Sequence, residues 1–185
     1  MSALLETKPF AAILPSRFNQ VKRINKSCEA SSFYQDCLTR LQNVQQWNYM
    51  SLLSFAHTIT AHDASGLALN RPLEKGDHLK IAASSVIDGK RFFWFLVDEI
   101  EASKEIDLSE ESICITLREI ENPGLMMANS AINQFKSKCE LRLRRLINTI
   151  SMDIQIRSQQ TVDQSKIFLE YFRWELFAKQ ILLQL

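Results

Sequence analysis

Two side chains of this sequence have the type and the surroundings that proton transfer needs, and the first is His57. It shares a face with Phe55 and Ile59 in a run that alternates with a period of two. An imidazole titrates near neutral pH, so in a pocket it can orient a ligand or move a proton. The alternative is a hydrogen-bonded histidine of the core or of a sheet edge, and most histidines in such positions are structural.

The second is Glu99, near the end of the most hydrophobic run of the chain. It continues the alternation of Phe93 and Phe95, which predicts that it faces the apolar side. Burial there would raise its pKa and make it a candidate acid. The alternative is a carboxylate at a solvated rim, because charged groups are seldom buried unless paired. His57 and Glu99 are thus the candidate acid–base pair.

Other catalytic and metal-binding patterns are missing. The cysteines, Cys28, Cys37, Cys114 and Cys139, have neither zinc-finger nor CxxC spacing, and we expect reduced thiols. Histidine occurs only at positions 57, 62 and 78, too scattered to predict a metal site. There is no GxSxG nucleophile motif. Glycine occurs only four times, which argues against a phosphate-binding loop. We therefore expect no cofactor and no metal.

Composition sets the class of protein. A chain of 185 residues with 46% hydrophobic residues can bury one core, and its net charge of +1 gives no reason to expect a nucleic-acid partner. No run approaches the roughly 18 apolar residues of a membrane span. Glu6 and Lys8 interrupt the apolar start, which does not resemble a secretory signal. We expect a cytoplasmic protein, with residues 1–16 as an N-terminal arm and 17–185 as a single domain.

The elements that would position these side chains follow from periodicity. Phe135–Arg144 and Ile150–Arg157 alternate with a period of two, which is typical of a hairpin with one apolar face, and Leu141 and Met152 lie on that face. The chain then changes to a helical period from about Asp163 to the C-terminus. Its apolar stripe holds Ile167, Tyr171, Trp174, Ala178, Ile181 and Leu185.

The first part of the chain supplies the remaining elements. Residues 18–24 alternate like a strand, and the apolar spacing from about Cys28 to Gln42 predicts an amphipathic helix with Ser27 as its N-cap. Further strands are expected within 51–62, 79–83, 91–103 and 113–117. The predicted order is strand, helix, about six antiparallel strands and a long helix. This α+β pattern indicates a curved antiparallel sheet of about six to seven strands wrapped around the C-terminal helix.

A row of basic residues accompanies the predicted hairpin. It consists of Lys136, Lys138, Arg142, Arg144 and Arg145. One interpretation is a surface that faces an anion. We favour the solvated face of a strand, because Glu140 interrupts the row and aromatic side chains that could stack on bases are missing from that face.

This pattern resembles the START-like, or helix-grip, superfamily of polyketide cyclases, lipid-transfer domains and plant proteins that bind hydrophobic ligands. The resemblance lies in Ile24–Phe33, where a strand ends and a helix carries an early aromatic, and in Trp47, Gly76-Asp77 and Trp174. It covers about Phe18 to Leu185, with the arm 1–16 and a long insert at 122–134 as departures. It implies a cavity for an apolar molecule between sheet and C-terminal helix, and it supplies no catalytic residues.

The first functional hypothesis is therefore the binding of a hydrophobic small molecule or lipid. The residues expected to contact it are Phe55, His57, Phe93, Phe95, Leu141, Met152, Tyr171 and Trp174. A second hypothesis is an enzyme of the cyclase or dehydratase kind, with His57 and Glu99 as acid and base. A third is a closed interaction module without a cavity, which would bind a partner through the arm or the basic strand face.

Overall fold

The structure, a computed structural model, describes residues 16–49, 57–85, 89–105, 109–125, 137–158 and 174–183. The elements in chain order are β1 (Ser16–Arg23), α1 (Ser27–Gln42), α2 (Val44–Tyr49), β2 (His57–His62), β3 (His78–Ser85), β4 (Gly89–Glu105), β5 (Glu110–Ile120), the 3-10 turn η1 (Pro123–Leu125), β6 (Ser137–Leu146), β7 (Thr149–Ser158) and α4 (Trp174–Ile181). Phe55, Tyr171, residues 1–15 of the arm and residues 126–134 of the insert lie outside these ranges.

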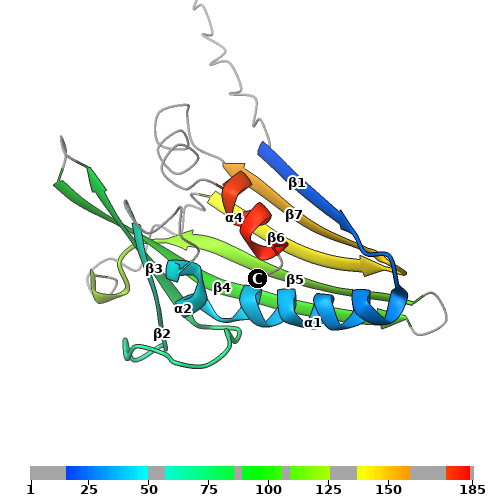
Figure 1. The fold of residues 1–185 in the computed structure, drawn as a ribbon. Helices are drawn as coiled ribbons and strands as arrows, with labels where there is room; N and C mark the ends of the chain where they lie inside the picture. Colours follow the sequence, from blue (N-terminus) through cyan, green and yellow to red (C-terminus); the bar gives the residue numbers. More distant parts are fainter. Residues whose placement is uncertain are drawn as a thin grey trace, which may run out of the picture.

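The strands form one seven-stranded sheet in the order β1-β7-β6-β5-β4-β3-β2, and every pairing is antiparallel. From β2 to β7, strands that are consecutive in sequence pair with each other. The exception is β1, whose Ser16 lies opposite Ile156 near the end of β7. Figure 1 shows the curved sheet with α1 and α4 on one side of it. We call this helix-covered side the inner face and the opposite side the outer face.

Alternation sets the two faces, as the sequence predicts for the hairpin. In β6, Cys139, Leu141 and Leu143 are buried, whereas Lys138 and Arg142 are exposed. Strand β7 continues the pattern with Ile150, Met152, Ile154 and Ile156, all buried. A period of two places one set on the core and the other in water.

Strand β4 breaks this alternation once. Val97 pairs with Leu117, but Glu99 pairs with Thr116, so one extra residue is inserted at Asp98. A bulge of one residue shifts all later side chains to the opposite face. Ile100 accordingly packs against the core. The expectation that Glu99 faces the apolar side is therefore wrong, and the Glu99 side chain is exposed on the outer face.

Helix α1 matches its predicted span and turns an apolar stripe inward. Its buried residues are Ala30, Phe33, Tyr34, Cys37 and Leu41. The predicted N-cap is off by one residue, because Lys26 occupies that position, with extended backbone and without a side-chain cap, and Ser27 is already helical. Helix α2 follows at once, and its buried Trp47 donates from Nε1 to the carbonyl oxygen of Arg40 at 3.0 Å.

Helix α4 is held at its C-terminal end by cations from two other elements. Arg40 of α1 donates to the carbonyl oxygens of Ile181, at 2.9 Å, and of Leu183. Lys22 of β1 donates to that of Leu182 at 3.4 Å. Both cations also lie over the ring of Phe33, 4.5 Å away for Lys22 and 5.7 Å for Arg40. The last carbonyls of a helix lack internal partners, so these donors tie α4 to α1 and β1.

The described residues confirm the predicted fold class. A curved antiparallel sheet, an N-terminal strand and helix, and a C-terminal helix pack around one cluster of buried apolar side chains. This is a helix-grip arrangement. The part of the final helix predicted before Trp174 lies outside the described ranges.

Candidate functional site

Four of the residues predicted to contact a ligand gather on the inner side of the sheet. Phe95 of β4, Leu141 of β6, Met152 of β7 and Trp174 of α4 are each at most 1% exposed. They come from four elements because the alternating strands and the helical stripe all turn inward. The inner face is thus an apolar wall made from distant parts of the chain.

Aromatic contacts join this wall to the helices. The ring of Phe177 meets that of Trp174 edge-on at 5.9 Å and that of Trp47 at 4.9 Å. Such T-shaped pairs add about 0.5–1.5 kcal/mol beyond the area they bury. Phe93, also among the predicted contacts, is partly buried and packs against the same core. Phe55 and Tyr171 lie outside the described residues.

Of the two candidate acid–base residues, the structure places the side chain of Glu99 only. His57 is the first residue of β2, opposite Ala83 of β3, and its side chain lies outside the described part of the structure. Glu99 lies on the outer face, because of the bulge at Asp98. An acid–base pair inside the fold would therefore need a carboxylate other than Glu99.

The inner face has a polar end that the sequence analysis did not identify. Glu111 of β5 lies opposite Arg145 of β6, and both side chains are buried. The Nε of Arg145 donates to Glu111 at 3.0 Å, and the Nζ of Lys104 contacts the other carboxylate oxygen at 2.7 Å. These hydrogen bonds, first from Lys104 and then from Arg145, lower the pKa of Glu111. Arg145, expected on the solvated basic face, is in fact part of the interior.

Tyr34 of α1 lies close enough to the Glu111–Arg145 ion pair for both charges to affect its pKa. Burial, together with the negative charge of Glu111, raises the pKa of Tyr34 to about 12. The phenol therefore keeps its proton at neutral pH and remains a hydrogen-bond donor within the interior. The sequence signal that could have identified this polar end is the period of two, because Glu111 lies two positions before Ile113 and Arg145 lies two positions after Leu143.

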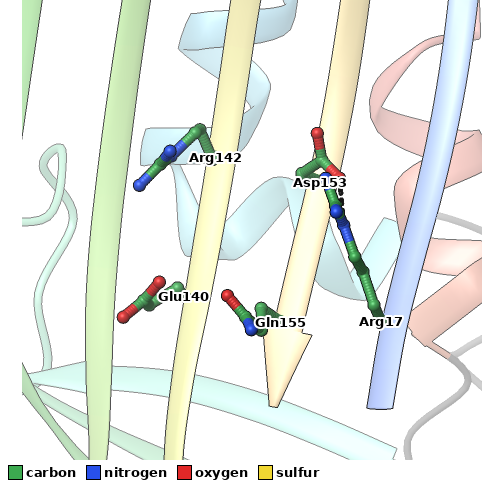
Figure 2. Close-up of a pocket in the computed structure, with 5 residues that line it drawn as sticks. All are labelled: Arg17, Glu140, Arg142, Asp153 and Gln155. Atoms are coloured by element: carbon green, nitrogen blue, oxygen red, sulfur yellow. Dashed lines mark hydrogen bonds and ion pairs between the residues drawn. The ribbon is translucent and has the colours of Figure 1, made fainter. Parts of the chain in front are cut away.

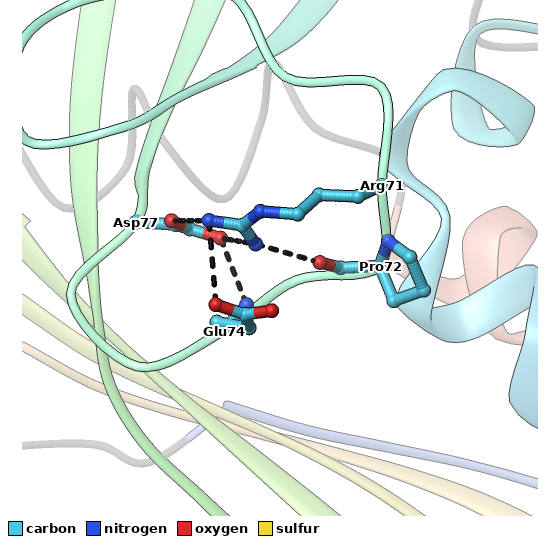
Figure 3. A network of polar contacts seen from close by, with 4 residues as sticks. All are labelled: Arg71, Pro72, Glu74 and Asp77. Carbon is cyan, nitrogen blue, oxygen red and sulfur yellow. Dashed lines mark hydrogen bonds and ion pairs between the residues drawn. The ribbon is translucent and has the colours of Figure 1, made fainter.

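A second buried carboxylate lies at the start of β3. Asp77 accepts two hydrogen bonds of 2.9 Å from Arg71 and one of 2.8 Å from the amide of Glu74 (Figure 3). The neighbouring Gly76 has a φ of +94°, which favours glycine, and its amide donates to the carbonyl of Val97. The network therefore closes the turn that precedes β3 and joins it to β4 beside the bulge. Its role is structural.

His62 of the outer face is held by ordinary contacts. The ring of His62 bonds to the Thr60 hydroxyl at 2.9 Å and to the carbonyl of Gly66 at 3.1 Å. It also lies 5.6 Å from the ring of Trp94. Over the described ranges, no group of His, Cys, Asp and Glu side chains is placed to hold a metal ion.

A polar pocket of about 240 Å³ lies on the outer face, over β1, β7 and β6. Its lining residues are Arg17, Glu140, Arg142, Asp153 and Gln155. Figure 2 shows the Arg17–Asp153 pair and, on the next strand, a guanidinium of Arg142 that points away from it. Of the basic row predicted from sequence, Arg142 reaches this pocket and Arg144 instead pairs with Glu110 at 2.7 Å. Lys136 lies outside the described residues.

Comparison with known proteins gives a likeness to solved structures and none to known sequences. No family model and no curated protein sequence matches the chain. Among solved structures, the chain is similar to major latex-like protein 151 from Panax ginseng, with 9% identity and a TM-score of 0.40 over 91% of this chain and 95% of that chain. At this TM-score the likeness carries no information about ligand or activity. In the described part of the chain, no helix is long and apolar enough to span a membrane.

Proposed function

We propose that the protein binds a hydrophobic small molecule between the inner face of its sheet and the helices α1 and α4. The observation that carries the proposal is the apolar wall of Phe95, Leu141, Met152 and Trp174. Binding sites for small molecules are lined mainly by apolar and aromatic side chains, with few polar groups that fix orientation.

The energetics favour an apolar ligand. Burial of about 250 Å² of apolar ligand surface would contribute roughly 6 kcal/mol before the entropic costs of association are subtracted. At one end of the inner face Glu111 and Arg145 pair with each other, and towards the other end Glu119 of β5 lies opposite Phe95. A ligand with a charged body would find no free partner along the wall formed by the described residues.

Orientation would come from the polar groups at the edges of the wall. Tyr34 offers a protonated hydroxyl, since its pKa is raised to about 12. His57 keeps its predicted role in holding the polar end of the ligand. We expect His57→Leu to change the preference among ligands more than the melting temperature. A variant that no longer folds would contradict this role.

The experiment is a thermal-shift screen with fatty acids, sterols, flavonoids and aromatic polyketides. A ligand at about 100 times its Kd stabilises the native state by about 2.7 kcal/mol, which a melting curve detects. A dose-dependent increase in Tm with one class supports the proposal. The absence of a shift with every class would contradict it and favour the closed interaction module.

Two phenylalanines of β4 provide a matched pair of variants for any hit. Phe95→Leu alters the inner wall, whereas Phe92→Leu makes the same change on the outer face, where Phe92 is 50% exposed. We expect Phe95→Leu to change the ligand's Kd several-fold and Phe92→Leu to leave it unchanged. The melting curve of each ligand-free variant serves as its own reference. If Phe95→Leu and Phe92→Leu changed the Kd equally, the ligand would bind outside the inner face.

A further inference from the structure

Strand β2 forms one edge of the sheet and has no lysine or arginine to protect that edge. It consists of His57–His62, with the sequence HTITAH. At the opposite edge, β1 contains Arg17, Lys22 and Arg23. An edge strand presents a row of backbone N–H and C=O groups with which another chain can pair, and cations in the strand oppose such pairing. Protection of β2 must therefore come from outside the strand.

The register of β2 shows which of its backbone groups face the open edge. Ile59 lies opposite Ile81 of β3. In an antiparallel ladder, every second residue directs its N–H and C=O towards the partner strand, and the residues between direct them away. The carbonyl of Ala61, two residues after Ile59, accepts from the amide of Leu69 at 2.8 Å, and Leu69 lies in the segment between β2 and β3. Ile59 and Ala61 thus belong to the set that faces the open edge.

Asn48 of α2 occupies this edge at Ile59. Its Oδ1 accepts from the amide of Ile59 at 2.7 Å, and its Nδ2 donates to the carbonyl oxygen of Ile59 at 2.6 Å. One side-chain amide therefore satisfies both outward groups of that residue, as the backbone of a neighbouring strand would. Figure 1 shows α2 beside β2 at the end of the sheet.

The packing of α2 fixes the position of this amide. Trp47, the residue before Asn48, is buried, and its ring meets that of Phe177 edge-on at 4.9 Å. Its Nε1 donates to the carbonyl oxygen of Arg40 in α1. Because the buried ring attaches α2 to the core, the amide of Asn48 is already in place and loses little conformational freedom when it bonds to β2.

We propose that Asn48 closes the edge of β2 and thereby prevents this strand from pairing with β2 of a second copy of the chain. A second copy is the partner that fits, because an antiparallel β2–β2 pair would join two six-residue strands that lack lysine, arginine and carboxylates. Such a pair opposes no permanent like charges and would satisfy the outward groups of Ile59 in both copies. The role concerns the edge of the sheet, so it does not depend on the hydrophobic-ligand proposal.

Three variants separate closure of the edge from a general loosening of α2. Asn48→Ala removes both hydrogen bonds to Ile59. Gln45→Ala is the control, because it removes the 3.4 Å hydrogen bond from Gln45 of the same helix to the carbonyl oxygen of Leu69 and leaves Ile59 covered. The double variant Asn48→Ala/Thr58→Lys adds a cation at an exposed position of β2, which should oppose pairing of the opened edge.

The test measures mass by light scattering after size exclusion, and amide hydrogen exchange, on the full-length protein over a range of concentrations. For Asn48→Ala we expect a mass that rises with concentration above that of the wild type. Its Ile59 amide should exchange at least about tenfold faster than in the wild type at low concentration, and should be protected again at high concentration, where a second copy replaces Asn48. Gln45→Ala should match the wild type in both measurements. The double variant should keep the fast exchange and the mass of the wild type.

Three results would overturn the proposal. One is an Ile59 amide that exchanges as slowly in Asn48→Ala at low concentration as in the wild type, which would mean that another group closes the edge. Another is fast exchange without an increase in mass at any concentration, since β2 would then need no protection. The third is association that persists unchanged in the double variant, which would place the contact elsewhere. A melting curve of each variant establishes that it is folded, and Asn48→Ser, whose side chain is shorter, replaces Asn48→Ala if the latter does not fold.

Discussion

Glu110 and Glu111 are neighbours in the chain, but β5 places them on opposite faces of the sheet. Glu110 pairs on the outer face with Arg144, whose side chain is 46% exposed. Glu111 pairs on the inner face with Arg145, and both of these side chains are less than one-tenth exposed. The first pair is screened by water, whereas the second has exchanged its hydration for mutual contact.

We therefore expect substitutions of the two glutamates to reduce the free energy of unfolding by unequal amounts. Glu111→Gln should reduce the free energy of unfolding at pH 7 by about 3 kcal/mol, since it leaves the buried Arg145 without its counter-ion. Glu110→Gln should cost less than about 1 kcal/mol. Urea unfolding followed by circular dichroism measures both. Losses of equal size would mean that the Glu111–Arg145 pair contributes no more than a surface ion pair.

The same carboxylate gives stability a dependence on pH. The pKa of Glu111 is lower in the folded protein than its ordinary value of 4.5. Its contribution is therefore complete above pH 4.5 and is lost as the pH falls through the folded pKa. We expect the stability of Glu111→Gln to vary less between pH 5 and pH 3 than that of the wild type. An identical slope in both proteins would assign the acid dependence to other groups.

Single residues also show where a periodic pattern succeeds and where it fails. Phe95, Leu141, Met152 and Trp174 were predicted to face inward, and they do, because their strands and helix keep a regular period around them. Glu99 was placed on the wrong face by the same rule. A bulge adds one residue without a distinctive signal in the sequence, so the parity of every later position in β4 is reversed.

At the scale of elements, the attachment of α4 depends on donors from other parts of the chain. Arg40 and Lys22 satisfy carbonyls that the helix leaves unpaired at its end, and both pack on Phe33. Hydrogen bonds from a charged donor contribute about 1.5–3 kcal/mol when the alternative is an unpaired group. The helix end is thus fixed by contacts that are distant in sequence.

Loss of one of these donors should loosen α4 before the rest of the fold. Arg40→Ala is expected to lower the free energy of unfolding by about 1–2 kcal/mol and to speed hydrogen exchange in Trp174–Ile181 more than in β6. Lys179→Ala is the control, because the exposed Lys179–Glu175 pair of the same helix contributes only about 0.5 kcal/mol. If amide hydrogen exchange became faster by the same factor throughout the sheet, Arg40 would not act as a local attachment of α4.

The elements themselves were largely predictable. The β6–β7 hairpin, α1 and the sequence of antiparallel strands follow from apolar periodicity alone, which is strongest where a long element has one wet and one dry face. The buried ends of the sheet were not predictable in the same way. Glu111 and Arg145 look like members of a solvated charged stretch until the register of β5 and β6 shows that they face each other.

At the scale of the whole molecule, the reaction rates of the four cysteine thiols can show how the core opens. Cys28 is exposed and Cys114 is partly exposed, whereas Cys37 and Cys139 are buried and none forms a disulfide. Burial raises the pKa of the Cys37 thiol to about 11 and that of Cys139 well above its ordinary value. The reactive thiolate is therefore scarce at both buried sites in the native state.

Thiol labelling at pH 8 should accordingly occur in distinct phases. We expect Cys28 to react fastest and Cys114 more slowly, while Cys37 and Cys139 react together at the rate at which the protein opens globally. Mass spectrometry of quenched samples locates each label, and low concentrations of urea should accelerate only the last phase. Labelling of Cys139 as fast as that of Cys28 would contradict the packed core described here.

The pairing of β1 with β7 has a consequence for the time course of synthesis. Strand β1 leaves the ribosome first, but its partner is encoded more than a hundred residues later, since Arg23 pairs with Thr149. At 5–20 residues per second, the first strand waits on the order of ten seconds for its neighbour. The antiparallel pairs from β2–β3 to β5–β6 can form in the meantime. A nascent chain halted before β7 would thus carry an unpaired β1. During that interval, chaperones that protect sheet edges could bind this strand.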